Sequence, residues 1–281
     1  GAGLGLPRAD LTGRVRAGKP VSVFIMDSCS VIRVGVHGAT GRMGRAVCQA
    51  VTEADGLELA ALVDADPSQG PVCGLEVTAE LRAFAESGCD VVVDFTIAEA
   101  TRGLVPFLAM HGIHAVIGTS GLSLDDVATF ADALDSGGVN GVLAANFAVS
   151  AALMTRFAAM AAPYFDTAEI IELHHDAKVD APSGTAIATA EAMQPPEGGW
   201  AEDPTRLDTL ENSRGGLGPN GVRIHSVRMR GMVAHQEVVL GAAGQTLTIR
   251  QDSYDRQSFM PGVVLAVKAV RDRPGMNDVR S

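Results

Sequence analysis

The chain has 281 residues, of which 47% are hydrophobic, so it can bury a sizeable core in one large or two ordinary domains. Its formal net charge of −11 argues against a nucleic-acid-binding protein held by a basic surface. The four cysteines have no CxxC or His-paired spacing, which argues against a disulfide framework or zinc ribbon and favours a reducing compartment, and no apolar run approaches the ~20 residues that span a membrane.

Residues 1–30 form the first segment, which is rich in glycine and basic residues and has no periodicity. Its short apolar run, residues 21–26, is smaller than a signal-peptide core of ~7–15 residues. We predict that 1–30 is a disordered leader or a cloning-derived segment, with Met26 as a plausible natural start.

Residues 31–147 alternate between strand-like and helix-like patterns. Continuous apolar runs, typical of strands covered on both faces, occur at 31–38, 57–64, 89–95, 113–119 and 140–147. Helical spacing falls between them, for example at 41–54 and 124–134. This alternation predicts βαβ units and a parallel sheet, and therefore an α/β domain.

The pattern changes after Asn146. A predicted helix (148–162) leads to a strand (168–175) and a second helix (183–193), and a Gly/Pro/Asn-rich stretch at 195–221 predicts a long loop. Strands with little helix between them then follow, which predicts an α+β domain on a mixed or antiparallel sheet; their ranges are 221–229, 235–243 and 245–252. The helical pattern at 256–273 is expected to pack back on the first domain.

The stretch GVHGATGRMG places glycines at 35, 38, 41 and 44, between the first strand and the first helix. Glycine lets the backbone turn tightly and bring its N–H groups close to a pyrophosphate at the positive end of a helix. Asp64, at the end of the second strand, is placed to accept hydrogen bonds from an adenosine ribose. It would repel a 2′-phosphate, which Arg42 and Arg45 could partly offset, so we predict use of NADH and NADPH with NADH preferred. An ordinary glycine-rich turn is the alternative.

Two further motifs, GTSG (118–121) and AANF (144–147), each end a predicted parallel strand. Ligands in open α/β sheets bind outside the carboxyl ends of the strands, so both motifs are expected to line a ligand crevice. They are also compatible with plain strand-to-helix turns.

The stretch 170–186, IIELHHDAKVDAPSGTA, contains one of only three lysines in the chain. Ser183, Gly184 and Thr185 open a helix, and free backbone N–H groups there suit a carboxylate or phosphate, although a plain helix cap uses the same residues. Histidine transfers protons near neutral pH, and lysine is a cation whose pKa shifts readily. These devices together indicate a reductase that acts on a small polycarboxylate.

Three other sites are weighed for this stretch. A metal centre built on His174, His175, Asp176 and Asp180 is disfavoured because the ammonium of Lys178 would repel the ion, and we predict no metal. A serine nucleophile at Ser183 lacks the G-x-S-x-G elbow. A Schiff base at Lys178 leaves the glycine loop unexplained.

The segment ELHHDAKVDAPSGTA (172–186) closely resembles the signature of the 4-hydroxy-tetrahydrodipicolinate reductase family, formerly called dihydrodipicolinate reductase. GATGRMG, DFT (94–96), GTSG, AANF, AHQEV (234–238) and GQTLTIRQDSYDRQSFMPGV (244–263) are similar to family motifs and follow the same order. The resemblance implies a Rossmann-like dinucleotide-binding domain, 31–147 with 254–281, and a substrate-binding and tetramerisation domain, 148–253. It also implies a cytoplasmic homotetramer in diaminopimelate and lysine biosynthesis that partners neither nucleic acid nor membrane.

The resemblance implies a role for each site residue. His174 would be the proton donor/acceptor and Lys178 the second proton donor, and His175, Ser183, Gly184 and Thr185 would bind the dicarboxylate substrate. NADH or NADPH would be held by Gly38, Ala39, Thr40, Gly41, Arg42, Met43, Asp64, Gly118, Thr119, Ser120, Ala144, Ala145, Asn146 and Phe147. The sequence departs from the family at Ser120, where threonine is usual, and at Gln251, where histidine is common.

Two alternative functions stay open from the sequence. One is another two-domain amino-acid or imino-acid dehydrogenase, such as an aspartate dehydrogenase. The other is a catalytically silent NAD(H)-binding regulator, against which the full set of proton-transfer residues argues.

Overall fold

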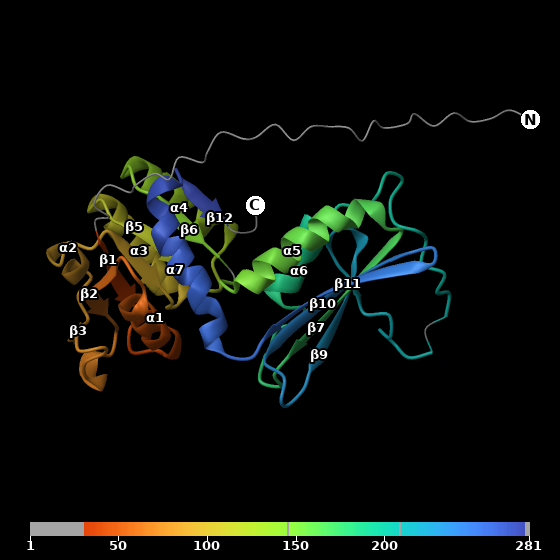
Figure 1. Cartoon of the computed structure of the whole chain (residues 1–281), viewed down its shortest axis with the longest axis horizontal. Helices are drawn as coiled ribbons and strands as arrows, with labels where there is room; N and C mark the ends of the chain where they lie inside the picture. The colour runs from red at the N-terminus through yellow and green to blue at the C-terminus, as the bar shows by residue number, and fades with distance from the viewer. Residues whose placement is uncertain (1–30, 145, 208, 279–281) are drawn as a thin grey trace, which may run out of the picture. The chain divides into compact units, whose positions relative to one another are not determined.

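The computed structural model describes residues 31–144, 146–207 and 209–278, and the predicted leader 1–30 lies outside these ranges. The first of its two sheets is parallel, with the strand order β12-β6-β5-β4-β1-β2-β3 (Figure 1). Its strands are β1 (Ile32–His37), β2 (Leu57–Val63), β3 (Val77–Thr78), β4 (Val91–Asp94), β5 (His114–Ile117), β6 (Gly141–Leu143) and β12 (Met276–Asp278). The five predicted apolar runs form its centre, and β3 and β12 add short strands at its two edges.

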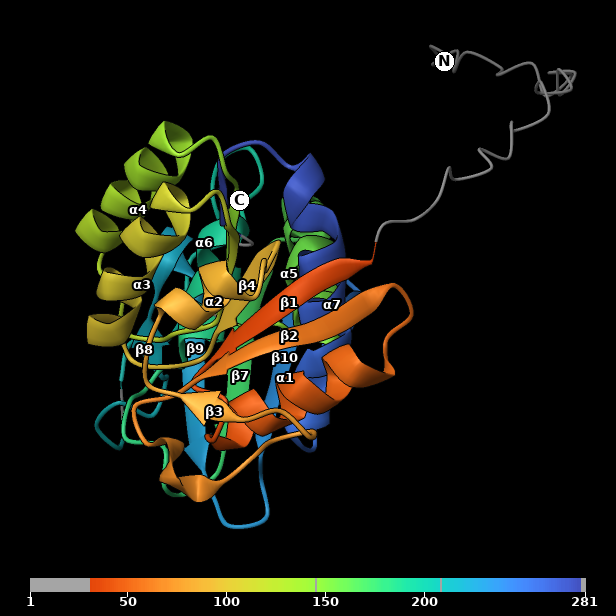
Figure 2. The same ribbon diagram turned by 90° about the vertical axis from the view of Figure 1, so that its left-hand side faces the viewer.

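Helices cover both faces of this sheet, which explains why its strands are apolar throughout. On one face lie α1 (Arg42–Glu53) and α7 (Met260–Ala269), and on the other lie α2 (Arg82–Glu86), α3 (Ala98–Met110) and α4 (Leu124–Ser136) (Figure 2). The C-terminal helix and β12 therefore return to the first sheet, where Val263 and Val267 are fully buried.

The central strands end in register. Cα pairing aligns Val63, His37, Asp94, Ile117 and Leu143, the last residues of β2, β1, β4, β5 and β6. The strand order reverses between β1 and β4, so ligands are expected in the crevice beyond these carboxyl ends. The glycine loop, Asp64, GTSG and AANF all begin one residue after an aligned position. The parallel sheet thus brings these four motifs together at the carboxyl ends of its strands.

The second sheet is mixed, in the order β11-β10-β7-β9-β8. Its strands are β7 (Thr167–His174), β8 (Gly216–Leu217), β9 (Arg223–Arg228), β10 (Ala234–Ala242) and β11 (Gln245–Ser253). The β7–β9 pair is parallel and the other pairs are antiparallel. Helices α5 (Val149–Ala161) and α6 (Gly184–Ala192) cover one face, and the core between them and the sheet contains Met154, Ile170 and Leu240 (Figure 1). The predicted combination of a parallel α/β sheet with a mixed α+β sheet is confirmed.

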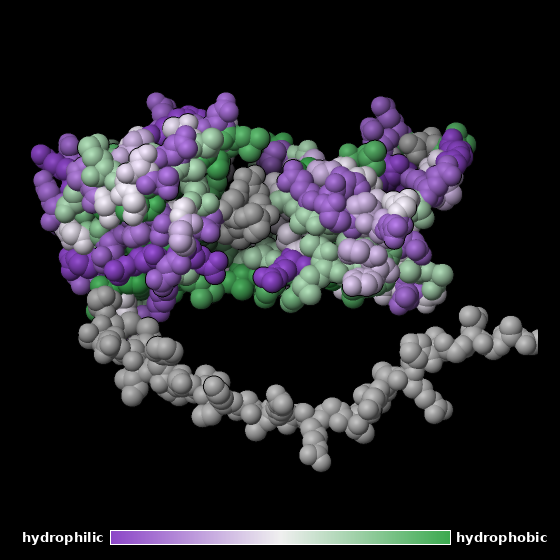
Figure 3. Space-filling view, turned by 90° about the horizontal axis from the view of Figure 1, so that it is seen from above, coloured by the Kyte–Doolittle hydropathy of each residue, from purple (hydrophilic) through white to green (hydrophobic). Residues whose placement is uncertain are grey.

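The surface is mixed in character. Figure 3 shows hydrophilic residues over much of one face, interrupted by smaller hydrophobic groups. Among the described residues, no helix is long and apolar enough to cross a membrane.

Candidate active site

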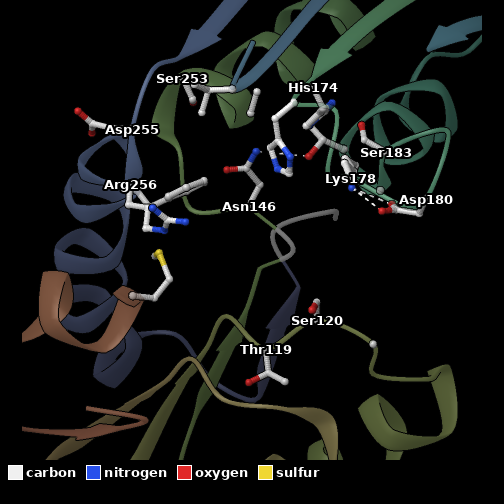
Figure 4. Close-up of a pocket in the computed structure, with 18 of the residues that line it drawn as sticks. Thr119, Ser120, Asn146, His174, Lys178, Asp180, Ser183, Ser253, Asp255 and Arg256 are labelled. Atoms are coloured by element: carbon white, nitrogen blue, oxygen red, sulfur yellow. Dashed lines mark hydrogen bonds and ion pairs between the residues drawn. The ribbon is translucent and has the colours of Figure 1, made fainter. Parts of the chain in front are cut away.

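One pocket of about 740 Å³ contains most of the residues predicted to do chemistry. Side chains that follow the first sheet line one side, and side chains from β7, α6 and the turn between them line the other (Figure 4). The predicted residues that line it are Met43, Thr119, Ser120, Asn146, His174, His175, Lys178, Ser183, Gly184 and Thr185. The pocket therefore brings proton-transfer groups, an anion-binding helix start and part of the predicted cofactor edge together.

His174 is the last residue of β7, and a hydrogen bond to Glu172 fixes the orientation of its ring. Its Nδ1 lies 2.5 Å from Oε2 of Glu172, two residues earlier on the same face of the strand. Glu172 is fully buried, and Arg228 donates to both of its carboxylate oxygens at 2.8 and 2.9 Å. Burial alone would raise the pKa of Glu172, but the hydrogen bonds from His174 and Arg228 outweigh it and lower this pKa to about 2. The carboxylate is therefore charged, and it leaves Nε2 of His174 free for the pocket.

Lys178 lies on the turn between β7 and α6. Its Nζ contacts both carboxylate oxygens of Asp180 at 2.8 Å, and this hydrogen bond lowers the pKa of Asp180. The lysine side chain is 20% exposed and that of Asp180 is 59% exposed, so the pair faces the pocket rather than the core. An ammonium has three N–H donors, so one stays available for a ligand.

The start of α6 is both a cap and an anion site. Ser183 is the N-cap residue, and its Oγ accepts from the backbone N–H of Ala186 at 3.2 Å. The backbone N–H of Ser183 donates to Oε1 of Glu172. The backbone N–H groups of Gly184 and Thr185 have no partner among the described residues, and an added Cβ at Gly184 would meet only open space. These two donors and the helix dipole can accept a carboxylate.

His175 and His174 both line the pocket but differ in exposure. His175 is exposed and lines the pocket, whereas His174 is partly buried above Glu172. Within the described ranges, no group of three or more His, Cys, Asp or Glu side chains could hold a metal ion.

The glycine loop packs tightly against the start of α1. A Cβ on Gly44 would lie 1.9 Å from the carbonyl oxygen of Gly38, and Gly38 itself has a φ of +81°. Both positions therefore require glycine. Arg45 donates its Nε to the carbonyl of Thr40, which ties this arginine to the loop, while Arg42 is exposed. The loop has the backbone shape that a dinucleotide pyrophosphate needs.

Asp64 lies beside this loop. Its Oδ2 accepts from the backbone N–H of Thr40 at 2.9 Å and its Oδ1 accepts from Asp66 at 3.1 Å. Burial is the largest single influence and would raise the pKa of Asp64, but these hydrogen bonds lower it overall. The carboxylate is charged and keeps lone pairs for the hydroxyls of a ribose.

The remaining predicted cofactor residues lie outside the pocket lining. Gly118 packs on Phe95, whose ring would lie 2.2 Å from an added Cβ. Ala144 and Phe147 are buried and border a second groove beside α5 and α7, and Ala145 lies outside the described residues. The other residues of this set follow β1 and β2 rather than facing the pocket: Gly38, Ala39, Thr40, Gly41, Arg42 and Asp64. An extended dinucleotide would have to connect these two places.

Asp94 is a supporting residue that the sequence did not assign. It ends β4 fully buried, and it accepts hydrogen bonds from Thr101 and Thr119 at 2.6 and 3.1 Å. Nδ1 of His37, at the end of β1, lies 3.0 Å from its other oxygen, which Thr96 also contacts. Burial would raise the pKa of Asp94, but the bonds from His37 and the threonines lower it. Asp94 therefore ties together three neighbouring strand ends.

Other residues that line the pocket were also missed. Ser253, Tyr254, Asp255 and Arg256 come from the segment that leads from β11 back to α7. They lie in GQTLTIRQDSYDRQSFMPGV, whose similarity to family motifs marked the stretch without assigning any of these residues a role in the site. Gln251, flagged for its departure from the family, is buried and donates to Ser253 rather than facing the pocket.

Comparison with known protein families gives the same answer for both parts of the chain. The family model described as dihydrodipicolinate reductase, N-terminus, matches residues 32–147, and that described as dihydrodipicolinate reductase, C-terminus, matches residues 150–280.

Individual relatives agree with the family models. The chain is 48% identical over 252 residues to a 4-hydroxy-tetrahydrodipicolinate reductase of Nocardia farcinica, covering 87% of this chain and 95% of that protein. It is 46% identical over 250 residues to the protein of the same name from Corynebacterium urealyticum, covering 88% and 96%. Among solved structures, a dipicolinate-bound dihydrodipicolinate reductase from Paenisporosarcina sp. TG-14 matches with a TM-score of 0.79 and 34% identity, covering 88% of this chain and 97% of that one.

Proposed function

Because the chain belongs to the dihydrodipicolinate reductase family, we propose that it reduces 4-hydroxy-tetrahydrodipicolinate, by way of dihydrodipicolinate, to tetrahydrodipicolinate. The observation that carries this proposal is the single pocket that unites His174, Lys178 and the start of α6 with Thr119 and Ser120. This reaction would belong to diaminopimelate and lysine biosynthesis, as the family resemblance implies.

A pyridine nucleotide supplies the hydride in this reaction. The glycine loop of residues 38–43 would hold its pyrophosphate, and Asp64 would accept from its adenosine ribose. Residues 118–120 and 144–147 would hold the nicotinamide end beside the pocket. The crowding of Gly44 against Gly38 supports this, because a side chain at residue 44 would push the loop away from the start of α1. The backbone N–H groups of residues 38–41 are bonded within the chain, so the first turn of α1, which begins at Arg42, would supply the donors.

His174 and Lys178 would supply the proton that accompanies the hydride. Nε2 of His174 faces the pocket because Nδ1 is engaged by Glu172, so the protonated ring can donate from Nε2. The third N–H of Lys178 would donate beside a substrate carboxylate, after Asp180 takes the other two.

The substrate is expected to be a small dicarboxylate bound by cations and helix N–H groups. His175, Ser183, Gly184 and Thr185 would hold its carboxylates. Dipicolinate, which the Paenisporosarcina protein binds, is a planar dicarboxylate of this class. The free N–H groups at the start of α6 suit one carboxylate, and Lys178 suits the other.

For the cofactor, we propose dual use with NADH preferred. The charged carboxylate of Asp64 would repel a 2′-phosphate, and Arg45 is occupied by the carbonyl of Thr40. Arg42 is the exposed cation left in the loop that could approach such a phosphate.

We further propose that the enzyme works as a cytoplasmic homotetramer. The three described cysteines are free thiols, which suits a reducing compartment. Among the described residues, no helix covers the second face of the mixed sheet, and this face would be the assembly surface of the 148–253 domain (Figure 1). The other domain, 31–147 with 254–281, would bind the cofactor. Light scattering of the purified chain tests the assembly.

The direct test generates the unstable substrate in the cuvette, with the enzyme that condenses pyruvate and aspartate semialdehyde. We expect oxidation of NADH, followed at 340 nm, only when both enzymes and both precursors are present. Turnover of another imino or amino acid without turnover of this substrate would favour the second dehydrogenase class. Tight NADH binding without any turnover would favour the silent regulator.

A further inference from the structure

A buried ion pair, Glu172 with Arg228, lies directly beneath the proposed site. Glu172 is fully buried on β7, and Arg228 reaches it from the neighbouring parallel strand β9. Oε1 of Glu172 accepts from Nη2 of Arg228 at 2.8 Å and from the backbone N–H of Ser183 at 3.2 Å. Oε2 accepts from Nη1 of Arg228 at 2.9 Å and from His174 at 2.5 Å.

The Glu172–Arg228 pair contacts all three functional parts of the pocket, which are His174, the turn with Lys178 and the start of α6. Through Oε2 it orients His174, and through Oε1 it holds the backbone of Ser183 at the start of α6. Nη2 of Arg228 also donates to the backbone carbonyl of Asp180 at 2.6 Å, and the side chain of Asp180 is paired with Lys178. A shift of the ion pair would therefore move the histidine, the lysine turn and the helix start together.

The partners of Glu172 decide which nitrogen of His174 carries the proton. A charged carboxylate can only accept hydrogen bonds, so Nδ1 of His174 must donate. In the neutral ring Nε2 then has the lone pair, and in the charged ring Nε2 has the proton to give. In the neutral and in the charged ring, Nε2 is therefore the nitrogen that can react in the pocket. Figure 4 shows His174 and Asn146 close together in this pocket.

Stability alone does not account for such a pair. A buried ion pair is often no more stabilising than apolar residues of equal volume. Moreover, Nε of Arg228 is buried without a partner among the described residues, which costs free energy. The pair is better explained by what it holds in place.

We propose that Glu172 and Arg228 are positioning residues that keep His174 in the Nδ1–H tautomer and fix the Lys178 turn for proton transfer. The proposal rests on the proposed reductase function for its kinetic part. In that reaction, the cofactor gives the hydride and His174 gives one proton from Nε2. The ring is then neutral with its proton on Nδ1, and solvent recharges it for the next turnover.

Glu172→Gln is the sharpest test, because the amide has one accepting and one donating end. In one orientation the amide oxygen of the glutamine takes the place of Oε1 and accepts from Nη2 of Arg228 and from the N–H of Ser183. The amide NH₂ then takes the place of Oε2, where it meets the donor Nη1 of Arg228. If its oxygen takes the place of Oε2, two such conflicts arise, at Ser183 and at Nη2. The first orientation is favoured and turns an NH₂ toward His174, so the ring must move its proton to Nε2.

The measurement is the imidazole ¹⁵N spectrum of the full chain, labelled at histidine, with His174→Asn to assign the signal. We expect the Nδ1–H pattern in the unsubstituted protein and the Nε2–H pattern in Glu172→Gln. A wrong tautomer in a related Asp–His pair costs on the order of 10⁴-fold in turnover, so kcat should fall by about 10²- to 10⁴-fold.

The chain offers a matched control on the same strand. Glu169 also pairs with a histidine, His225 at 2.7 Å, and an arginine, Arg214 at 2.6 Å, but it lies on the opposite face of the sheet, away from the pocket. Glu169→Gln should leave the tautomer of His174 and kcat unchanged. Because Glu169 lies on the face proposed for assembly, light scattering of this variant must match that of the unsubstituted chain. If Glu169→Gln and Glu172→Gln lower kcat equally, the effect is structural and the proposal is wrong.

The outcomes separate this proposal from the proposed function. An Nε2–H pattern in the unsubstituted protein would overturn the positioning role, even if Glu172→Gln does not fold. Absence of reductase activity in a chain that shows the Nδ1–H pattern would remove the function while supporting the tautomer assignment. As a second variant, Arg228→Lys should keep the Nδ1–H pattern but raise KM for the substrate, since the contact to Asp180 is lost; an unchanged KM would contradict the role of Arg228.

Discussion

Each half of the site rests on one fully buried carboxylate, but the two are held by different partners. Asp94 supports the edge of the parallel sheet, and its partners are threonine hydroxyls, a backbone N–H and His37. Glu172 supports the mixed-sheet half, and its partners are the guanidinium of Arg228, the ring of His174 and one backbone N–H.

The difference indicates what each half does. Hydroxyl groups, a backbone N–H and His37 surround Asp94 and fix the backbone of three strand ends, with no arginine among these partners. Charged partners around Glu172 fix side chains that can exchange a proton. Substitutions in the first half should therefore act on cofactor affinity, and those in the second half on turnover.

The largest expected effect lies in the second half. His174→Ala should lower kcat by about 10²- to 10⁴-fold, the range for loss of a general acid, because the pocket then lacks one of its two proposed proton donors. Lys178→Ala should lower kcat severely as well. The Kd for NADH, measured by fluorescence titration, should stay within twofold in both variants. Near-normal turnover in both would refute the assigned roles, and a large loss of NADH affinity would break the division between the halves.

In the parallel-sheet half, we expect substitutions to act by displacing the backbone of the glycine loop. Gly44→Ala would place a methyl group 1.9 Å from the carbonyl oxygen of Gly38, so the loop or α1 must shift by about 1 Å. A misplacement of that size can cost on the order of 10²-fold, and we expect this loss in NADH affinity. Gly103→Ala is the control, because Gly103 lies in α3 with open space around an added Cβ and should gain stability of about 0.5–1 kcal/mol. Equal NADH affinity in the two variants would count against the loop as the cofactor site.

Low pH should destabilise the mixed-sheet half because Glu172 becomes protonated. Its pKa is lowered from 4.5 to about 2 in the folded chain, so its charged form contributes stability above about pH 4.5. That contribution, on the order of 3 kcal/mol, is lost as the pH falls from about 4.5 to 2. In urea unfolding, the difference in free energy of unfolding between the unsubstituted chain and Glu172→Gln should therefore shrink over this window. A constant difference would mean that Glu172 is not held as a charged group.

The sequence predicted the two sheets and ten of the 22 residues that line the pocket, because their signals are local. Apolar runs marked the five central strands, and GVHGATGRMG and the His–Lys stretch each lie within 20 residues. The two edge strands β3 and β12 have two and three residues, too few for a periodic pattern, and only pairing with β2 and β6 defines them.

The support beneath the site was harder to predict. A glutamate after two isoleucines suggests a solvent-facing position, yet Glu172 shares the buried face of Ile170 and His174. That i, i+2 spacing was the available signal. Arg228 lies 56 residues further along the chain, and nothing local announces that β9 pairs with β7. The partner of Lys178, Asp180, was adjacent in the sequence but was considered only as a metal ligand.

The smallest expected effect concerns the choice between NADH and NADPH, and it tests the parallel-sheet half alone. Asp64 accepts from Thr40 and Asp66 and keeps lone pairs for a ribose, and its charge disfavours a 2′-phosphate. In Asp64→Ser the repulsion is gone while Arg42 remains. We expect the ratio of kcat/KM for NADH to that for NADPH to fall about tenfold, which corresponds to about 1.4 kcal/mol. If the unsubstituted enzyme already favours NADPH tenfold, the role of Asp64 is wrong. Because Asp64 does not line the pocket that contains His174, kcat at saturating NADH should not change. A fall in kcat would show that the two halves are coupled.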